Sequence, residues 1–497
     1  MMPRTARLVM TQEQYQVLRR NLLQPDGLER AAVALAGRRF AGRDIDLYLH
    51  SALFPADAEC RQQGRVVVEP EPAWILRSFR VFADSPAPVY LHAHSHPFSA
   101  TATFSGVDDA YLAGEIQSLA GYLRLRERTR AAWFLRLVWG TREDGFAGEC
   151  YSADGCLIAR VGELRVVGRD GIRRIYAAGH GNGASDAQAL PIARLDRNIR
   201  WLGLAGQDRL RKTHLVICGV GGLGSAVVAN ARGLGFRRIT VVDPDRVESS
   251  NLSRLFGARS RDVGRQKVAV MRRYIQEVET DADVVAVPES VGSPAGRAAL
   301  LDGDLLVCGL DSVEARLEAQ ILAARYLKPL LDLGSGIALA PGTTQVRHMG
   351  GQAIFYIPGG PCLLCQGLDL SRVRSPEHQA VRRAVGYVDG TDETPPSAIT
   401  INSVCAGIGM DLVVKYLTGF GPFPTYLRYD FLAHRTQQFT FSRQSACQIC
   451  GTAGVEGFGD EEAIPLQSPV LGRLGDTPEH LEADREKERA RAASSEQ

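Results

Sequence analysis

The feature that most constrains the fold of this chain is a glycine-rich loop between an apolar segment and a helix-like segment. The loop reads Gly219-Val-Gly221-Gly222-Leu-Gly224. Residues 214–218 before it are apolar, and the Ala/Val-rich segment after it closes at Gly233 and Gly235. Apolar runs at 239–242 and 304–308 continue an alternation of strands and helices. That alternation predicts an α/β fold with a parallel, doubly wound, Rossmann-like sheet.

A glycine loop at this place predicts a nucleotide site. Backbone N–H groups at the start of the following helix can cradle phosphate oxygens. Asp243 stands at the end of the next predicted strand, where a carboxylate can bind a ribose hydroxyl. NAD-dependent oxidoreductases use the same loop and need little beyond it, so they remain an alternative that nucleotide preference would test.

Charged segments after that strand favour ATP chemistry over NAD chemistry. They are Asp243-Pro-Asp245, Asn251-Leu-Ser-Arg254 and Gly264-Arg-Gln-Lys267. A carboxylate that attacks an α-phosphate brings two anions together, so basic side chains must neutralise both. The segments therefore predict phosphoryl chemistry on ATP.

At these residues the chain resembles a known family. Residues 194–267 are similar to the adenylation domain shared by ubiquitin-activating enzymes and the ThiF/MoeB proteins. The matching parts are R-L-D-R-N, G-V-G-G-L-G, D-P-D, N-L-S-R and G-R-Q-K. The resemblance implies binding of ATP and Mg²⁺ and adenylation of a partner protein's C-terminal carboxylate. The nucleotide-binding residues that it implies are Gly219, Gly221, Gly222, Gly224, Asp243, Asp245, Asn251, Arg254, Lys267 and Asp311.

The resemblance also implies individual roles. Asp243 would hold the ribose, Arg254 and Lys267 would contact the phosphates, and Asp311 would bind magnesium. Arg197 would reach the ATP of a neighbouring subunit, which implies a homodimer. The chain departs from the family pattern at two places: Leu255 replaces a glutamine, and Ser312 replaces the asparagine after Asp311.

Two cysteine pairs predict a structural zinc site. They are Cys362-Leu-Leu-Cys365 and Cys447-Gln-Ile-Cys450. Four thiolates form a closed tetrahedral site, and the presence of two pairs argues against a redox dithiol. The pairs also match places in the ThiF/MoeB family. Cys405 lies at the start of an apolar helix, where a buried core residue is favoured over a thioester-forming one.

A second metal pattern lies near the N-terminus. His94-Ser-His96-Pro97 is followed by Ser105-Gly-Val-Asp108. Two imidazoles and a carboxylate can hold a zinc ion and leave a fourth position for water. Ser105 and Asp108 also fit a helix capping box. His92 and His94 form a competing pair of histidines with the same spacing.

Taken whole, this pattern resembles the JAMM/MPN metalloproteases over roughly the first 165 residues. The resemblance implies an α+β, cytidine-deaminase-like domain in which zinc-bound water attacks a peptide or isopeptide carbonyl. A distant glutamate would act as general base, and Glu29 before the run Ala31–Gly37 is the candidate. Glu69 and Glu71 compete with it. Ser105 would support the oxyanion.

Composition limits the setting of these sites. The formal net charge of +2 gives no reason to expect a nucleic-acid partner. Without a signal peptide or an 18-residue apolar run, we expect a cytoplasmic protein without a membrane span. The predicted parts are a JAMM/MPN domain (1–178), a linker (179–190), an adenylation domain (191–458) and a polar tail (459–497).

Both predicted domains act on the same kind of object, a ubiquitin-like protein with a Gly-Gly C-terminus. One would trim its tail or cleave its conjugates, and the other would activate it, with a conjugating enzyme as a further partner. Two alternatives stay open. The activated protein can be a sulfur carrier that becomes a thiocarboxylate, or the N-terminal domain can be a docking module without catalytic activity.

Overall fold

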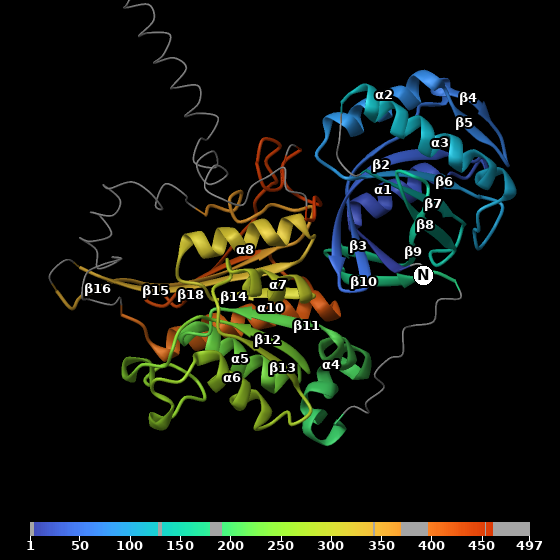
Figure 1. The fold of residues 1–497 in the computed structure, drawn as a ribbon. Helices are drawn as coiled ribbons and strands as arrows, with labels where there is room; N and C mark the ends of the chain where they lie inside the picture. Colours follow the sequence, from blue (N-terminus) through green and yellow to red (C-terminus); the bar gives the residue numbers. More distant parts are fainter. Residues whose placement is uncertain are drawn as a thin grey trace, which may run out of the picture.

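A computed structural model describes residues 4–127, 132–178, 191–340, 343–368, 396–452 and 454–460. The predicted linker and the tail beyond residue 460 lie outside the described residues. Two eight-stranded sheets organise the chain, one before residue 178 and one after residue 191. Figure 1 shows the first, in blue to teal, beside the second, in green to red.

The first sheet has the strand order β1-β3-β2-β6-β7-β8-β9-β10, and β1 also pairs with β9, so seven strands form a closed ring. Helix α1 follows β1, and α2 and α3 flank β6. The elements are β1 (Arg4–Thr11), α1 (Gln12–Leu22), β2 (Ala31–Ala41), β3 (Asp44–Leu53), η1 (Asp57–Glu59), β4 (Cys60–Gln63), β5 (Val68–Pro70), α2 (Pro72–Asp84), β6 (Val89–Ser95), α3 (Gly106–Leu125), β7 (Trp133–Trp139), β8 (Phe146–Ser152), β9 (Leu157–Gly168) and β10 (Gly171–Tyr176).

The second sheet has the order β13-β12-β11-β14-β15-β16-β17-β18. Strands β11 to β15 run parallel, whereas β16, β17 and β18 extend the sheet in antiparallel pairs. The elements are α4 (Ile192–Lys212), β11 (His214–Cys218), α5 (Gly222–Leu234), β12 (Arg238–Val242), η2 (Ser249–Asn251), η3 (Ser260–Asp262), α6 (Lys267–Gln276), β13 (Asp283–Val287), α7 (Pro294–Asp302), β14 (Leu305–Cys308), α8 (Val313–Arg325), β15 (Leu330–Leu339), β16 (Val346–Tyr356), α10 (Ile399–Thr418), β17 (Tyr426–Asp430) and β18 (Arg435–Phe439).

Alternation along the parallel strands places helices on both faces of this sheet. Val216 and Cys218 of β11 belong to the core packed by α7 and α8. Leu215 and Ile217 of the same strand belong to the core packed by α5, α6 and α10. Successive side chains of a strand point to opposite faces, so β11 is buried on both sides. The prediction of a doubly wound sheet is confirmed.

Most predicted elements agree with the structure, and one is wrong. The predicted helix at 13–23 is α1, and the strands expected at 89–92 and 134–139 are β6 and β7. The strand expected at 66–68 is not formed there, because the Gly64 backbone N–H donates to the Val67 carbonyl and closes a turn. The strand β5 therefore begins only at Val68 and pairs with β4.

A buried carboxylate joins the two sheets. Asp304, just before β14, accepts a hydrogen bond from Arg174 Nη2 at 2.7 Å, and Arg165 Nη1 lies 3.6 Å from it. The backbone N–H of His214 also donates to Asp304. Burial alone would raise the pKa of Asp304, but the charges of Arg174 and Arg165 hold it well below its usual range. The first sheet thus docks at the amino ends of the parallel strands.

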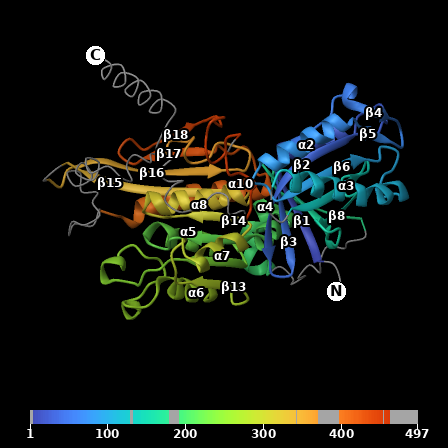
Figure 2. The same cartoon turned by 45° about the horizontal axis from the view of Figure 1, so that its top comes forward.

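A segment after the last cysteine pair completes this contact. The Gly37 N–H of β2 donates to the Gly457 carbonyl at 3.2 Å, and a Cβ at Gly37 would overlap the backbone of Phe458. The His50 ring packs on the Phe458 ring with centroids 4.0 Å apart. Figure 2 shows the edge of the first sheet facing the second sheet around α10 and β14.

Helix α10 is, among the helices that the structure describes, the one long and apolar enough to cross a membrane. More than half of its apolar window is buried inside the protein (56%). Its residues pack in the core together with β15, β16 and α5. A core helix of a water-soluble fold meets the same length and composition test, so the feature is weak evidence for a membrane span.

We predict that Asp304→Asn destabilises the protein. The substitution leaves the buried Arg165 beside a neutral amide, and breaking a buried pair in this way costs about 3 kcal/mol. Thermal unfolding of the full chain should show a clearly lower midpoint. Asp302→Asn is the matched control, because Asp302 pairs with Arg39 at 3.6 Å but its side chain is 74% exposed. Equal midpoints for the two variants would contradict the prediction.

Candidate functional site

The glycine loop forms a tight turn from β11 into α5. Gly219 has φ +77°, and a Cβ at this position would lie 2.9 Å from the Gly309 carbonyl oxygen. A Cβ at Gly224 would overlap the Gly219 carbonyl oxygen. A Cβ at Gly221, in contrast, would meet nothing within 4 Å. The loop therefore keeps open space beside the N-terminus of α5, where phosphate oxygens can approach backbone N–H groups.

Gly222 contacts two side chains from distant segments. A Cβ at this position would lie 2.6 Å from Nδ2 of Asn402 and 3.2 Å from Cδ of Arg254. Arg254 was predicted at the site, whereas Asn402 was missed. Asn402 is buried on α10 and accepts a hydrogen bond from Ser335 Oγ at 2.8 Å. A single asparagine in an apolar helix gives no sequence signal of this contact.

Asp243 points from the end of β12 towards the loop. Its Oδ2 accepts the Val220 N–H at 2.7 Å, and its Oδ1 accepts the Asp245 N–H at 2.8 Å. Burial raises the pKa of Asp243, and the nearby charge of Lys267 opposes that rise. Lys267 Nζ lies 2.7 Å from Asp245 Oδ2. Two carboxylates and a buried ammonium group therefore lie beside the glycine loop.

Asn251 and Arg254 lie in and just after the short helix η2, which follows β12. Asn251 caps the short helix η2 by accepting the Glu248 N–H at 3.2 Å, and Arg254 Nη1 donates to the Ser250 carbonyl at 2.8 Å. Leu255, which departs from the family pattern, is buried in the apolar core.

Asp311 is exposed at the carboxyl end of β14, at the start of α8. Ser312, the second departure, caps α8 by accepting the Ala315 N–H at 3.1 Å, so a hydroxyl serves where the family has an amide. Arg197 lies on α4 with its side chain 87% exposed, and its Nε is 4.0 Å from Asp196 Oδ2. Arg197 is therefore not brought to the loop of its own chain.

The four paired cysteines come together although they lie far apart in the sequence. Cys362 Sγ is 3.5 Å from Cys447 Sγ, and Cys365 Sγ is 3.6 Å from Cys450 Sγ. All four sulfur atoms lie within 4.8 Å of one another. In a tetrahedral zinc site with Zn–S bonds of about 2.3 Å the sulfurs are about 3.8 Å apart, so the four thiols fit zinc.

Cys405 lies outside that cluster. It is 3% exposed on α10, and burial raises its pKa to about 12. A Cβ at Gly351 of β16 would overlap the Cys405 sulfur, so this thiol fills the space beside a glycine in the sheet. The prediction that Cys405 is a buried core residue is confirmed.

The N-terminal metal pattern also forms a cluster. His94 Nε2 lies 3.1 Å from Asp108 Oδ1, and His96 Nε2 lies 3.7 Å from Asp108 Oδ2. The three ligand atoms lie within 4.8 Å of one another. His94 Nε2 is buried and has no hydrogen-bond partner among the described residues, although it lies close to Asp108. An orphaned imidazole nitrogen beside a carboxylate fits a metal ion.

The capping box and the metal cluster use the same carboxylate. Ser105 Oγ accepts the Asp108 N–H at 3.2 Å, and the Ser105 N–H donates to Asp108 Oδ2 at 2.6 Å. The predicted capping box is therefore formed, and the role of Asp108 as a metal ligand stays a prediction. His92 is not part of the cluster, because its Nδ1 pairs with Glu115 of α3 at 2.9 Å.

Glu29 is the glutamate that the structure brings to the cluster. It is 5% exposed, and its Oε1 lies 3.7 Å from His96 Nε2. Burial, with a smaller contribution from the charge of Asp108, raises the pKa of Glu29 to about 7. Glu69 pairs instead with Arg61 at 3.6 Å, and Glu71 precedes α2. The cluster combines the loop before β2, the end of β6 and the start of α3.

Known proteins are similar to part of this chain, and three of them are described in turn. A SAMP-activating enzyme E1 of Haloferax volcanii is 25% identical over 281 residues, which cover 56% of this chain and 96% of that enzyme. A sulfur carrier protein adenylyltransferase of Thermus thermophilus is 29% identical over 50% of this chain and 86% of that protein. The human ubiquitin-like modifier-activating enzyme 7 is 33% identical over 171 residues, but the chain spans only 17% of its length.

The match to a family model covers the second sheet. It extends over residues 195–449, just over half of the 497 residues, and includes the glycine loop, Asp311 and three of the four paired cysteines, ending one residue before Cys450. The first sheet lies outside the matched residues, so its identity as a metalloprotease domain stays a prediction. With its Rossmann-type sheet and this match, the chain belongs to the ThiF family.

Proposed function

We propose that the second half of the chain uses ATP to adenylate the C-terminal carboxylate of a ubiquitin-like or sulfur-carrier protein. The observation that carries this proposal is the convergence of the glycine loop, Asp243, Lys267 and Asp311 at the carboxyl edge of one parallel sheet. The names of two relatives, an E1 enzyme and a sulfur carrier protein adenylyltransferase, support the same reaction.

The proposed reaction is a displacement at the α-phosphorus of ATP. An oxygen of the carboxylate forms a bond to this phosphorus, the bond to the β-phosphate oxygen breaks, and pyrophosphate leaves. Arg254 and Lys267 would offset the negative charge that two anions bring together. Asp243 would orient the ribose, and Asp311 would hold Mg²⁺, which neutralises phosphate charge when bound.

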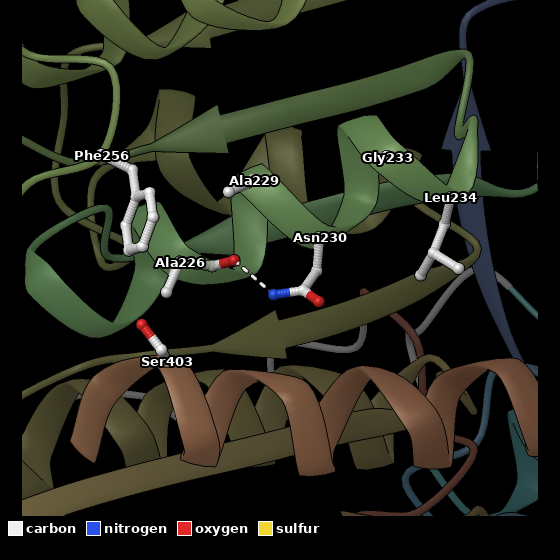
Figure 3. A pocket seen from close by; sticks show the side chains of 7 residues that line it. All are labelled: Ala226, Ala229, Asn230, Gly233, Leu234, Phe256 and Ser403. Carbon is white, nitrogen blue, oxygen red and sulfur yellow. Dashed lines mark hydrogen bonds between the residues drawn. The ribbon is translucent and has the colours of Figure 1, made fainter. Parts of the chain in front are cut away.

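We also propose a homodimer in which Arg197 serves the partner's site. Arg197 points into solvent on α4, and Trp201 and Leu204 of the same helix are 43% and 56% exposed. The helix contacts the end of α5 through Asn198, which donates to the Gly233 carbonyl. Beside it lies an open hollow lined by Ala226, Ala229, Asn230, Gly233, Leu234, Phe256 and Ser403 (Figure 3). A second copy of the chain would cover these apolar groups.

A mixing experiment tests both proposals. Lys267→Ala and Arg197→Ala should each abolish exchange of labelled pyrophosphate into ATP with a Gly-Gly-ended carrier. If Arg197 acts on the partner's site, an equimolar mixture should recover about a quarter of the wild-type rate, because only mixed dimers contain one complete site.

Arg200→Ala is the matched control, since Arg200 lies on the same helix with its side chain 66% exposed. A mixture without recovery, while wild type and Arg200→Ala exchange normally, contradicts a shared site. Should the wild-type chain show no exchange with any such carrier, adenylation itself is refuted.

We propose that the four paired cysteines bind one structural zinc ion. Cys450 leads directly into residues 454–460, which contact the first sheet, so the ion would fix this segment as well. Cys447→Ser should remove one zinc per chain and lower the thermal midpoint, whereas Cys156→Ser, at an exposed thiol, should change neither. Retention of full zinc content by Cys447→Ser would contradict the site.

We propose that the first half is a JAMM-like zinc peptidase that trims the tail of the same carrier or cleaves its conjugates. His94, His96 and Asp108 would hold the zinc, which supplies an activated water when bound. Glu29, beside His96, would take the proton from the attacking water and deliver it to the leaving amine. Ser105 Oγ accepts one hydrogen bond and keeps its O–H to donate to an oxyanion. The proposed boundaries, 1–178 and 191–458, are supported by the placement of one sheet in each range.

Glu29→Gln should separate catalysis from binding. We expect the variant to keep its zinc and to cleave a tail-extended carrier about 10²–10⁴ times more slowly, the range for loss of a general base. Glu69→Gln should cleave normally. If wild type and Glu29→Gln both bind the tail and neither cleaves it, the first half is a docking module, and the peptidase proposal is wrong.

A further inference from the structure

The metal carboxylate Asp108 stands on an exposed turn. Gly106, Val107 and Asp109 around it are exposed, and the capping box ties Asp108 only to Ser105 of the same turn. Of the two histidines of the cluster, His94 lies on β6 and His96 directly follows this strand. A carboxylate can complete a metal site only when its helix is held at a fixed place relative to the other ligands.

Arg136 spans the gap between the sheet and this turn. It lies on β7, directly beside His92 of β6 in parallel register, and is 8% exposed. Its Nη1 forms an ion pair with Asp109 Oδ1 at 2.8 Å, and its Cζ lies 3.8 Å from the centre of the Phe104 ring. Phe104 and Asp109 immediately flank the segment from Ser105 to Asp108. The guanidinium therefore contacts the residue before the capping box and the residue after it.

The other edge of the guanidinium is anchored in the sheet. Arg136 Nη2 donates to Glu149 Oε2 at 2.6 Å, and Arg136 Nε donates to the same oxygen at 3.1 Å. Glu149 also accepts hydrogen bonds from Tyr151 and Arg160. A planar guanidinium presents several donors in a rigid fork, which a lysine or glutamine cannot reproduce. Arg136 therefore fixes the start of α3 relative to β7 and β8.

We propose that Arg136 is a positioning residue for the N-terminal metal site: it places Asp108 against His94 and His96 without being a ligand. This inference rests on the proposed zinc site. If Arg136 only stabilised the first sheet, its replacement would lower the stability of the chain and leave the metal affinity of folded molecules unchanged. A positioning arginine changes that affinity selectively.

Zinc competition titration of the full chain tests the inference, with His94→Ala identifying which of two bound ions belongs to this site. Arg136→Gln and Asp109→Asn should each lower the affinity for that ion. For Arg136→Gln we expect a loss of about 10–100-fold, the range for removal of an outer partner of a metal ligand. The double variant should bind no more weakly than Arg136→Gln, because both changes remove one interaction. The four-cysteine ion should be unaffected.

Arg160→Gln is the matched control, since Arg160 donates to the same Glu149, its side chain is 56% exposed, and it forms no ion pair with the described residues of α3. It should bind zinc as the wild type does. If Arg136→Gln fails to fold, Asp109→Asn decides, because Asp109 is 61% exposed. Wild-type affinity in Asp109→Asn, or independent effects in the double variant, would overturn the inference. If His94→Ala still binds as many zinc ions as the wild type, the proposed metal site is wrong.

Discussion

The common direction of the parallel strands is the constraint on which the rest of the structure depends. Because β11, β12, β14 and β15 run the same way, every turn at their carboxyl ends meets at one edge of the sheet. The glycine loop, Asp243 and Asp311 all follow such ends. The amino ends form the opposite edge, and the first sheet docks there through Asp304. The common strand direction therefore places the candidate nucleotide site at one edge of the sheet and the contact with the first sheet at the opposite edge.

The first sheet has a similar separation. Strand β2 pairs with His94 of β6 at Ala31, beside Glu29, whereas its Gly37 contacts the segment from the second half. Six residues of strand correspond to about 20 Å. The candidate metal site and the candidate nucleotide site therefore lie on opposite sides of the contact between the two halves.

Three buried carboxylates have different environments and different uses. At the contact between the sheets, Asp304 is matched by two arginines, so its carboxylate stays ionised and joins the halves. Asp243 accepts hydrogen bonds from two backbone N–H groups, one of them in the glycine loop. Among the residues that the structure describes, His96 is the side chain paired with the Glu29 carboxylate, and burial raises the pKa of Glu29. A poorly matched buried carboxylate marks a functional site more often than a matched one.

The sequence by itself determined the features that depend on local spacing. The glycine loop, the alternating strands and helices, the cysteine pairs and the histidine pattern all follow from residues close in the chain, where backbone geometry limits the outcome. Only one predicted strand was wrong, and a turn at Gly64 and Val67 explains it. The antiparallel strands β16 to β18 were not predicted. The pairing of β16 with β17 joins segments separated by a long stretch of chain, whereas β17 and β18 form a hairpin.

Only the tertiary structure decided between residues that look equivalent in the sequence. It brought Glu29, and not Glu69 or Glu71, to the histidines, and it placed Asn402 against Gly222. It also joined the two cysteine pairs and set Arg136 between Asp109 and Glu149. These contacts link residues far apart in the chain, and their geometry is set by how the sheets pack and where their strands end. Local spacing carries no information about such distances.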